Sequence, residues 1–285
     1  IQYVQGRSAV QGPAGMRTLD RPEPGMGSLA TPEPGVVEQV RGRDCLITEL
    51  CRIYGRWPRT ADRVHVLHGI GGVGKTTAAA EIARRLRRRG VAVWWISAAS
   101  QTDIEAGMRL LARRLGASAL ELDFQWSENA PDVLWRRLDA HRGRWLLVID
   151  NADDPHLLAP AGEAVAAQRG WIRRVGHRRG AVVVTSRIGD PVVWGHWCVQ
   201  HRLSMMSSAD AAQVLLDHAG SHAGSTADAA SLVERLGGLP LALGLAGRYL
   251  ADTGRLGLPG HPTTFADYHA SLDRDGVAAV FNDPG

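Results

Sequence analysis

The chain has 285 residues, of which 45% are hydrophobic and 22% are charged, an ordinary globular composition with room for one large and one smaller domain. No apolar run reaches the roughly 20 residues of a membrane span, and the three cysteines form no C-x-x-C pair, which favours a cytoplasmic protein with reduced thiols and no membrane partner. The net charge of +4 is small, and its arginine clusters match no base-reading motif, so we expect no nucleic-acid binding by this chain.

The first 35 residues are rich in glycine, proline and glutamine and contain Pro-Glu-Pro-Gly twice, at 22–25 and 32–35. Such a segment buries too little apolar surface to offset its ordering entropy, so we expect residues 1–35 to form a disordered arm or linker. Apolar residues at helical spacing follow, from Leu46 to Ile53. Because the chain begins with isoleucine, we expect it to be part of a longer protein.

Residues 69–76 read Gly-Ile-Gly-Gly-Val-Gly-Lys-Thr and fit G-x-x-x-x-G-K-[ST], the pattern of a phosphate-binding loop. Its glycines let the backbone curl so that N–H groups point at phosphate oxygens, while Lys75 can neutralise the β and γ phosphates and the Thr76 hydroxyl can ligate Mg²⁺. The flanking runs 64–68 and 77–89 predict a buried strand and a helix whose positive N-terminal end faces the same anion. The residues predicted to bind the phosphates are Gly69, Gly71, Gly72, Val73, Gly74, Lys75, Thr76 and Thr77.

Strands and helices alternate after this loop. Thr102 or Asp103 can cap one helix, and Pro131 fits the first turn of the next. This alternation predicts an α/β fold: a P-loop NTPase core with a parallel β-sheet flanked by helices. Four further apolar runs predict its strands, the last one weak and at an edge: 91–96, 145–149, 181–184 and 198–203.

From about residue 204 the pattern becomes entirely helical. Ser207 begins a capping box, and Pro240 opens a helix with Leu241, Leu245 and Tyr249 on one face. We therefore predict a nucleotide-binding domain over residues 36–203 and a small all-helical domain over 204–285.

Acidic residues follow the apolar run 145–149. Asp150 ends that strand, and its carboxylate is expected to hold Mg²⁺ together with the Thr76 hydroxyl. The alternative is an aspartate that only caps a turn. The amide of Asn151 is a poor base, so Asp153 or Asp154 could activate water, or both could cap the helix near Pro155. The sequence leaves this choice open and makes slow turnover a natural consequence.

Arg187 closes the third of these strands, on the ligand side of the predicted sheet. From there it can sense a γ-phosphate and stabilise charge during phosphoryl transfer. The alternative is an arginine in a surface salt bridge, and the position at a strand end favours the phosphate role.

These motifs together resemble the NB-ARC nucleotide-binding module of the STAND class of signalling ATPases, over about residues 36–275. The phosphate-binding loop is common to many NTPases, whereas Gly-Leu-Pro-Leu-Ala downstream of a Thr-Ser-Arg strand end is far more specific. The matching segments are 69–76, 146–150, 184–187 and 238–242, and residues 40–43 are similar to the family segment that lies against adenine.

The resemblance implies that ATP or ADP binds between the two domains. Pro240, with Leu241 beside it, would pack against the nucleotide, and Arg187 would report the γ-phosphate. ADP would hold the protein closed, and exchange for ATP would open it and lead to a homo-oligomer. The residues implied to contact adenine are Val40, Arg41, Gly42 and Arg43.

We therefore expect an ATP/ADP-binding switch with slow ATP hydrolysis, part of a larger signalling or transcriptional regulator. Asp-Asn-Ala at 150–152 replaces the paired aspartates of plant and animal members. No winged-helix segment or repeat array follows, so winged-helix, repeat or effector domains are expected elsewhere in the polypeptide. The alternative is a DNA-associated AAA+-type ATPase, which would need an arginine such as Arg235 or Arg248 on the nucleotide. A small-molecule kinase would leave the Gly-Leu-Pro-Leu-Ala helix without a role.

Overall fold

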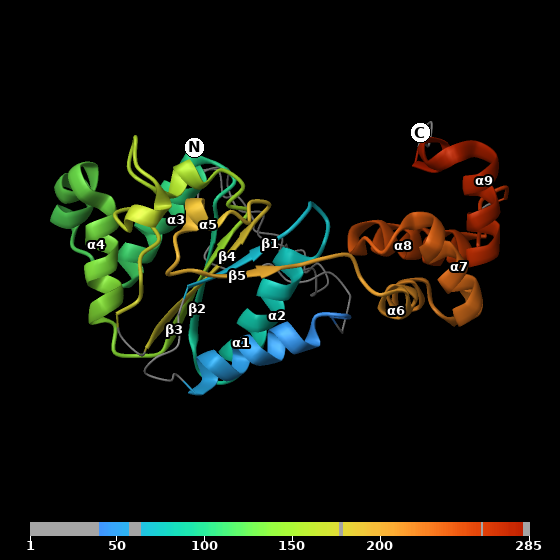
Figure 1. The fold of residues 1–285 in the computed structure, drawn as a ribbon, viewed down its shortest axis with the longest axis horizontal. Helices are drawn as coiled ribbons and strands as arrows, with labels where there is room; N and C mark the ends of the chain where they lie inside the picture. The colour runs from blue at the N-terminus through green and yellow to red at the C-terminus, as the bar shows by residue number, and fades with distance from the viewer. Residues whose placement is uncertain (1–39, 57–63, 177–178, 258, 282–285) are drawn as a thin grey trace, which may run out of the picture.

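The computed structural model describes residues 40–56, 64–176, 179–257 and 259–281, so the predicted arm over 1–35 lies outside the described residues. Figure 1 shows two bodies, a sheet covered by helices and a group of helices beyond its last strand. None of the helices in the described ranges is long and apolar enough to cross a membrane.

The first body is built on a five-stranded parallel sheet with the strand order β2-β3-β4-β1-β5. This confirms the predicted parallel sheet, with β5 at the predicted edge. Continuous apolar runs form its central strands because helices cover both faces. The strands are β1 Val64–His68, β2 Ala92–Ser97, β3 Trp145–Asp150, β4 Gly180–Ser186 and β5 Val199–Arg202.

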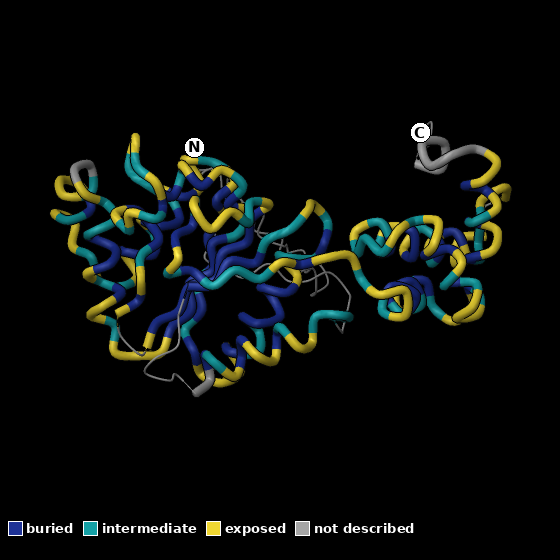
Figure 2. The backbone as a smooth tube through the Cα atoms, viewed as in Figure 1, coloured by how far each residue is buried: buried dark blue, intermediate teal, exposed yellow. Residues whose placement is uncertain are grey.

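Two hydrophobic cores lie on opposite faces of this sheet, and alternate residues of β3 supply both. Leu147 and Ile149 pack with α3 Gln101–Arg114 and α4 Trp126–Ala140, whereas Leu146 and Val148 pack with α1 Asp44–Arg56 and α2 Lys75–Arg87. Figure 2 shows the strands as the buried centre of this body. Because the strands are parallel, their carboxyl ends lie at one edge of the sheet, and the loops that follow them project from that edge.

Two helix starts differ from the sequence prediction. The N-cap of α3 is Ser100, whose hydroxyl accepts a hydrogen bond from the Asp103 N–H at 3.1 Å, so neither Thr102 nor Asp103 is the cap. Helix α4 begins before Pro131, but Asn129 has non-helical angles (φ −154°, ψ 54°), and Pro131 follows that break. A π-helical turn, η1 Glu121–Gln125, was not predicted, and short turns η2 Pro155–Leu158, η3 Val165–Ala167 and α5 Pro191–Trp194 cross the loops.

The second body is entirely helical, as the sequence predicted. Its core includes Leu215, Leu232, Leu250 and Phe265, all fully buried. Its first two main helices begin at serine caps, which fix where each starts. The elements are α6 Ser208–Ala219, η4 Ser221–Ala223, α7 Thr226–Leu236, α8 Pro240–Leu256 and α9 Phe265–Phe281.

Candidate functional site

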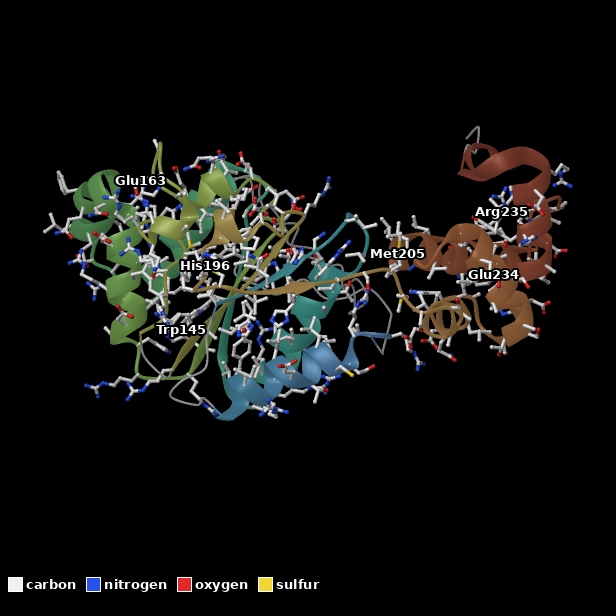
Figure 3. The ribbon with its side chains drawn as sticks, in the orientation of Figure 1. Trp145, Glu163, His196, Met205, Glu234 and Arg235 are labelled. Carbon is white, nitrogen blue, oxygen red and sulfur yellow. The ribbon has the colours of Figure 1, made fainter. Side chains whose placement is uncertain are left out.

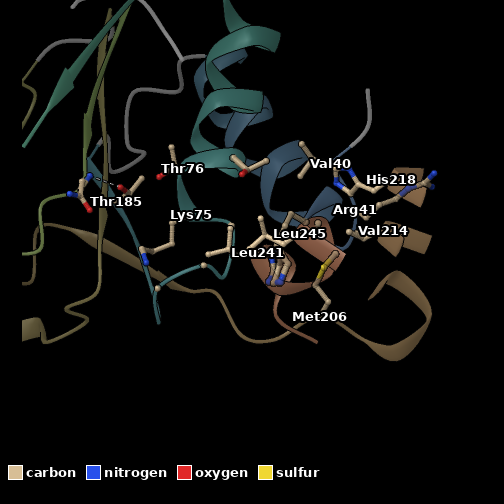
Figure 4. Close-up of a pocket in the computed structure, with 18 of the residues that line it drawn as sticks. Val40, Arg41, Lys75, Thr76, Thr185, Met206, Val214, His218, Leu241 and Leu245 are labelled. Atoms are coloured by element: carbon tan, nitrogen blue, oxygen red, sulfur yellow. Dashed lines mark hydrogen bonds between the residues drawn. The ribbon is translucent and has the colours of Figure 1, made fainter. Parts of the chain in front are cut away.

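A cleft of about 370 Å³ lies where the carboxyl edge of the sheet meets the helical body. That volume is within the range of small-ligand sites, roughly 300–1,000 Å³. Figure 4 shows Lys75 and Thr185 at one end of the cleft and Val214 and His218 at the other. The walls come from segments distant in sequence: the lead-in segment (residues 40–43), the loop 69–77, the carboxyl ends of β3 and β4, and the helices α6 and α8.

The loop 69–76 has the curled backbone that its glycines allow. Gly72 and Gly74 have φ angles of 76° and 92°, in the left-handed region that favours glycine. A Cβ on Gly72 would lie 2.9 Å from the Cβ of Leu241. Only a residue without a side chain therefore lets α8 approach the loop this closely.

Lys75 is the only lysine in the chain, and it opens α2 at the loop. Its Nζ donates hydrogen bonds to the carbonyls of Gly69 and Ile70, at 2.8 and 2.9 Å. Burial lowers the pKa of Lys75, Arg187 lowers it further, and Asp153 and Asp150 oppose the shift. The ammonium thus lies at the inner edge of the loop, lining the cleft.

Asp150 lies at the end of β3 in a network of oxygen atoms. Its Oδ1 accepts hydrogen bonds from the hydroxyls of Thr76, at 2.9 Å, and Thr185, at 2.5 Å. The Thr185 hydroxyl accepts in turn from the Asn151 N–H at 2.9 Å. Carboxylate and hydroxyl oxygens are the ligands that Mg²⁺ prefers, so the Thr76–Asp150 pair fits such an ion. Among the described residues no group of three or more His, Cys, Asp and Glu could hold a metal.

The two candidate bases have different surroundings. Asp153 lines the cleft, and its carboxylate accepts two hydrogen bonds from Arg187, one from the backbone N–H and one from Nε, each at 2.8 Å. Asp154 instead caps η2 by accepting from the His156 N–H at 3.0 Å, and it is not among the residues that line the cleft. Arg187 forms a salt bridge with Asp153 and also lines the cleft. The two alternatives predicted for it, a salt bridge and a place on the ligand side of the sheet, therefore occur together.

Helix α8 joins the helical body to the loop. The Leu241 N–H donates to the Gly72 carbonyl at 3.2 Å, and Pro240 Cγ lies 3.9 Å from where a Cβ of Gly74 would be. Leu241 and Leu245 are 56% and 47% exposed, because their face lines the cleft while Leu243 and its neighbours fill the core. The first turn of α8 is therefore part of the site.

The lead-in segment closes the opposite wall. Arg43 Nη2 donates to the carbonyls of Val73, at 3.3 Å, and Ser204, and burial lowers its pKa. Arg41 makes a two-pronged ion pair with Asp217 of α6, Nε to Oδ2 at 2.8 Å and Nη2 to Oδ1 at 3.1 Å. This segment thus contacts both bodies.

The structure brings together most of the residues predicted from sequence. Besides Asp154, four predicted residues do not line the cleft but lie next to residues that do: Gly42, Gly69, Val73 and Asp150. Gly69 approaches Leu203 so closely that a Cβ on it would be 2.5 Å from the Leu203 carbonyl oxygen. The predicted residues that line it are Val40, Arg41, Arg43, Gly71, Gly72, Gly74, Lys75, Thr76, Thr77, Asp153, Arg187, Pro240 and Leu241.

Sequence reasoning missed several lining residues. Some had a usable signal, because Leu241, Gly244, Leu245 and Arg248 follow the i, i+3, i+4, i+7 spacing of one helix face. The missed residues are Asn151, Thr185, Met206, Val214, His218, Gly244 and Leu245, while Arg248 was named only as an arginine that the AAA+-type alternative would need.

Comparisons with known proteins agree with this geometry. The NB-ARC domain family matches residues 55–221, more than half of the chain. A nucleotide-binding leucine-rich repeat (NLR)-like protein of Hyaloscypha variabilis is 35% identical over 102 residues, which are 35% of this chain and 10% of that protein, so the match spans about a tenth of that relative.

Two solved structures are similar in fold. The Aeropyrum pernix ORC1 protein in complex with DNA has a TM-score of 0.56 and 18% identity, over 84% of this chain and 67% of that one. Cdc6p from Pyrobaculum aerophilum has a TM-score of 0.57 and 17% identity, over 79% of this chain and 65% of that one. At these identities the likeness concerns the fold alone.

Proposed function

The chain belongs to the NB-ARC family, and from this premise we propose that it is a nucleotide-operated switch that binds ATP and ADP in the cleft and hydrolyses ATP slowly. The observation that carries the proposal is the contact of the phosphate-binding loop with the first turn of α8, Gly72 to Leu241. A nucleotide in the cleft touches both bodies, so its identity can bias how they are held together.

The two ends of the cleft suit the two ends of a nucleotide. Lys75, Thr76 and the loop N–H groups would bind the phosphates, with the N-terminal end of α2 adding its positive potential. Toward the other end, Met206, Val214 and Leu245 supply apolar surface for a base, beside the lead-in segment.

Thr76 and Asp150 would hold Mg²⁺ through the oxygens that already share a hydrogen bond. Bound there, the ion would neutralise charge on the phosphates of the substrate. Thr185 orients Asp150 from the neighbouring strand, since its hydroxyl donates to the same carboxylate oxygen.

In hydrolysis, water attacks the γ-phosphorus, the bond from that phosphorus to the β–γ bridging oxygen breaks, and ADP and inorganic phosphate leave. We assign the proton acceptor to Asp153, because it lines the cleft whereas Asp154 caps a helix. Asp153 is paired with Arg187 and could accept this proton only once that pair opens, which would slow hydrolysis.

The rest of the polypeptide enters only as a proposal. Winged-helix, repeat or effector domains would read the angle between the two bodies, and exchange of ADP for ATP would lead to a homo-oligomer. We place the protein in the cytoplasm, where its three free thiols would stay reduced.

One observation favours the DNA-associated AAA+-type alternative. Arg248 lines the cleft from α8, as that class requires of a helical-body arginine, whereas Arg235 pairs with Asp273 on the outer side (Figure 3). Salt-dependent binding of duplex DNA by this chain would support the alternative, and its absence would leave the switch as the better reading.

The proposal is tested by titration calorimetry of the chain with Mg-ADP and Mg-ATP. Lys75→Ala should weaken both affinities by about tenfold or more, because hydrogen bonds to charged groups contribute about 1.5–3 kcal/mol each. Arg255→Ala, which removes one positive charge from the exposed far end of α8, is the matched control and should change neither affinity. Equal affinities for wild type and Lys75→Ala would remove the loop from the function.

A further inference from the structure

We propose that Asp153 is the counter-ion that holds Arg187 until a γ-phosphate displaces it, so that Asp153 sets how strongly the cleft prefers ATP to ADP. The inference rests on the proposed function, because it concerns how the same cleft distinguishes the two nucleotides. Asp153 acts through Arg187 and is therefore a positioning residue for binding.

The contact between the two residues uses both carboxylate oxygens. Oδ1 accepts from the Arg187 backbone N–H and Oδ2 from its Nε, each at 2.8 Å. Asp153 thus fixes the backbone at the end of β4 and the direction of the side chain together. The two residues are 34 positions apart, so this contact also joins the loop after β3 to the end of β4.

The guanidinium held in this way lies against the phosphate-binding loop. A Cβ on Gly71 would be 3.7 Å from Arg187 Nη2, and both residues line the cleft. Its Nε is engaged by Asp153, while the Nη2 atom faces the loop. A third phosphate group emerging from the loop would therefore meet an arginine that already has an anionic partner.

The balance between the two anions is close enough to be switched. The side chains of Arg187 and Asp153 are 66% and 28% exposed, and an ion pair this open to water changes an equilibrium by only about fivefold at most. Arginine binds phosphate oxygens through charge-assisted hydrogen bonds as readily as it binds a carboxylate, and a γ-phosphate carries more negative charge than one carboxylate. A γ-phosphate can thus take Arg187 from Asp153, whereas ADP offers no such competitor.

Asp153 also opposes the third phosphate by its own charge. Burial lowers the pKa of Lys75, and Asp153 is the strongest of the charges that counter this shift, so its field reaches the phosphate end of the cleft. Like charges repel, so removal of this carboxylate should favour the nucleotide that carries more negative charge. Both effects of Asp153 therefore act in the same direction, against ATP.

The test is titration calorimetry of the whole chain with Mg-ADP and with the non-hydrolysable Mg-AMP-PNP. Asp153→Asn keeps the shape and one acceptor oxygen but removes the charge. We expect its preference for AMP-PNP over ADP to rise about two- to fivefold above that of wild type, with the larger change in the affinity for AMP-PNP. Asp190→Asn is the matched control, because Asp190 caps α5 just after Arg187 and does not line the cleft, and it should leave the preference unchanged.

A double-mutant cycle separates this role from a merely structural one. Arg187→Ala should reduce the preference for AMP-PNP, and adding Asp153→Asn to it should raise the preference by a smaller factor than in wild type, because the partner through which Asp153 mainly acts is gone. If wild type binds both nucleotides and Asp153→Asn leaves their ratio unchanged, or weakens both equally, the inference is overturned and the proposed function stands. If wild type binds neither nucleotide, the proposed function itself is overturned, and the inference with it.

Discussion

The ion pair between Arg41 and Asp217 should control how fast a nucleotide leaves the cleft. It ties the lead-in segment to α6, and Arg41 lines the cleft itself. If the base lies against this segment as proposed, the segment and α6 would have to separate before the nucleotide leaves. We therefore expect Asp217→Asn to speed the release of bound nucleotide.

The size of the effect follows from the geometry of the pair. The side chains are 27% and 24% exposed and share two hydrogen bonds, which places the pair near the upper end of the range for surface ion pairs, about 1 kcal/mol. One kcal/mol corresponds to about a fivefold change in an equilibrium constant, so release should become up to about fivefold faster. High salt should shrink the difference, because the pair is only half-buried.

The pH dependence has a definite sign. Burial alone would raise the pKa of Asp217, but its hydrogen bonds from Arg41 and Gln213 outweigh burial, and the pKa is lowered from its ordinary value of 3.8. The contribution of this carboxylate is thus complete above that value and is lost as the pH falls through the lower, folded-state pKa. Between pH 6 and 8 the effect of Asp217→Asn should therefore be constant.

Stopped-flow displacement of a fluorescent ADP analogue measures the release rate directly. Asp252→Asn is the matched control, since Asp252 pairs with Arg255 on the exposed surface of α8 at 3.4 Å, away from the cleft. Equal release rates for Asp217→Asn and wild type at low salt would refute the role given to the ion pair.

Two further substitutions test separate parts of the structure. Thr185→Val removes the donor to Asp150 and the acceptor for the Asn151 N–H. We expect a loss of about 1–3 kcal/mol in the free energy of unfolding, measured by denaturant titration, and a weaker Mg²⁺ dependence of ADP binding, measured by calorimetry. An unchanged Mg²⁺ dependence would contradict the role of Thr185. Ser225→Ala breaks the capping box of α7 and should cost about 1 kcal/mol of stability without altering nucleotide affinity, as thermal unfolding and calorimetry would show; a changed affinity would mean that α7 affects the cleft.

The sequence predicted the central body well because its signals are local. Strand β1 has the predicted bounds, 64–68, because its apolar residues Val64, Val66 and Leu67 are buried in the sheet and the phosphate-binding loop follows it directly. The phosphate-binding loop was equally plain, because its glycines are needed for backbone angles that other residues rarely adopt.

The contacts between the two bodies could not be predicted in the same way. Periodicity showed that Leu241 and Leu245 share a helix face, but not that this face lines a cleft instead of a core. The Arg41–Asp217 pair spans 176 positions, and no local pattern relates such residues. The roles assigned to Asp150, Asp153 and Arg187 in binding and hydrolysis stay predictions.

Lys75, at the inner edge of the loop, also makes the cleft chemically addressable. Since the chain has no other lysine, an amine-directed acylating reagent finds one side-chain amine in the whole sequence, besides the terminal amino group. Burial lowers its pKa, which enlarges the neutral, nucleophilic fraction at a given pH. The extent of acylation at Lys75, read by mass spectrometry of the peptide that contains it, would therefore report the fraction of molecules whose cleft is empty.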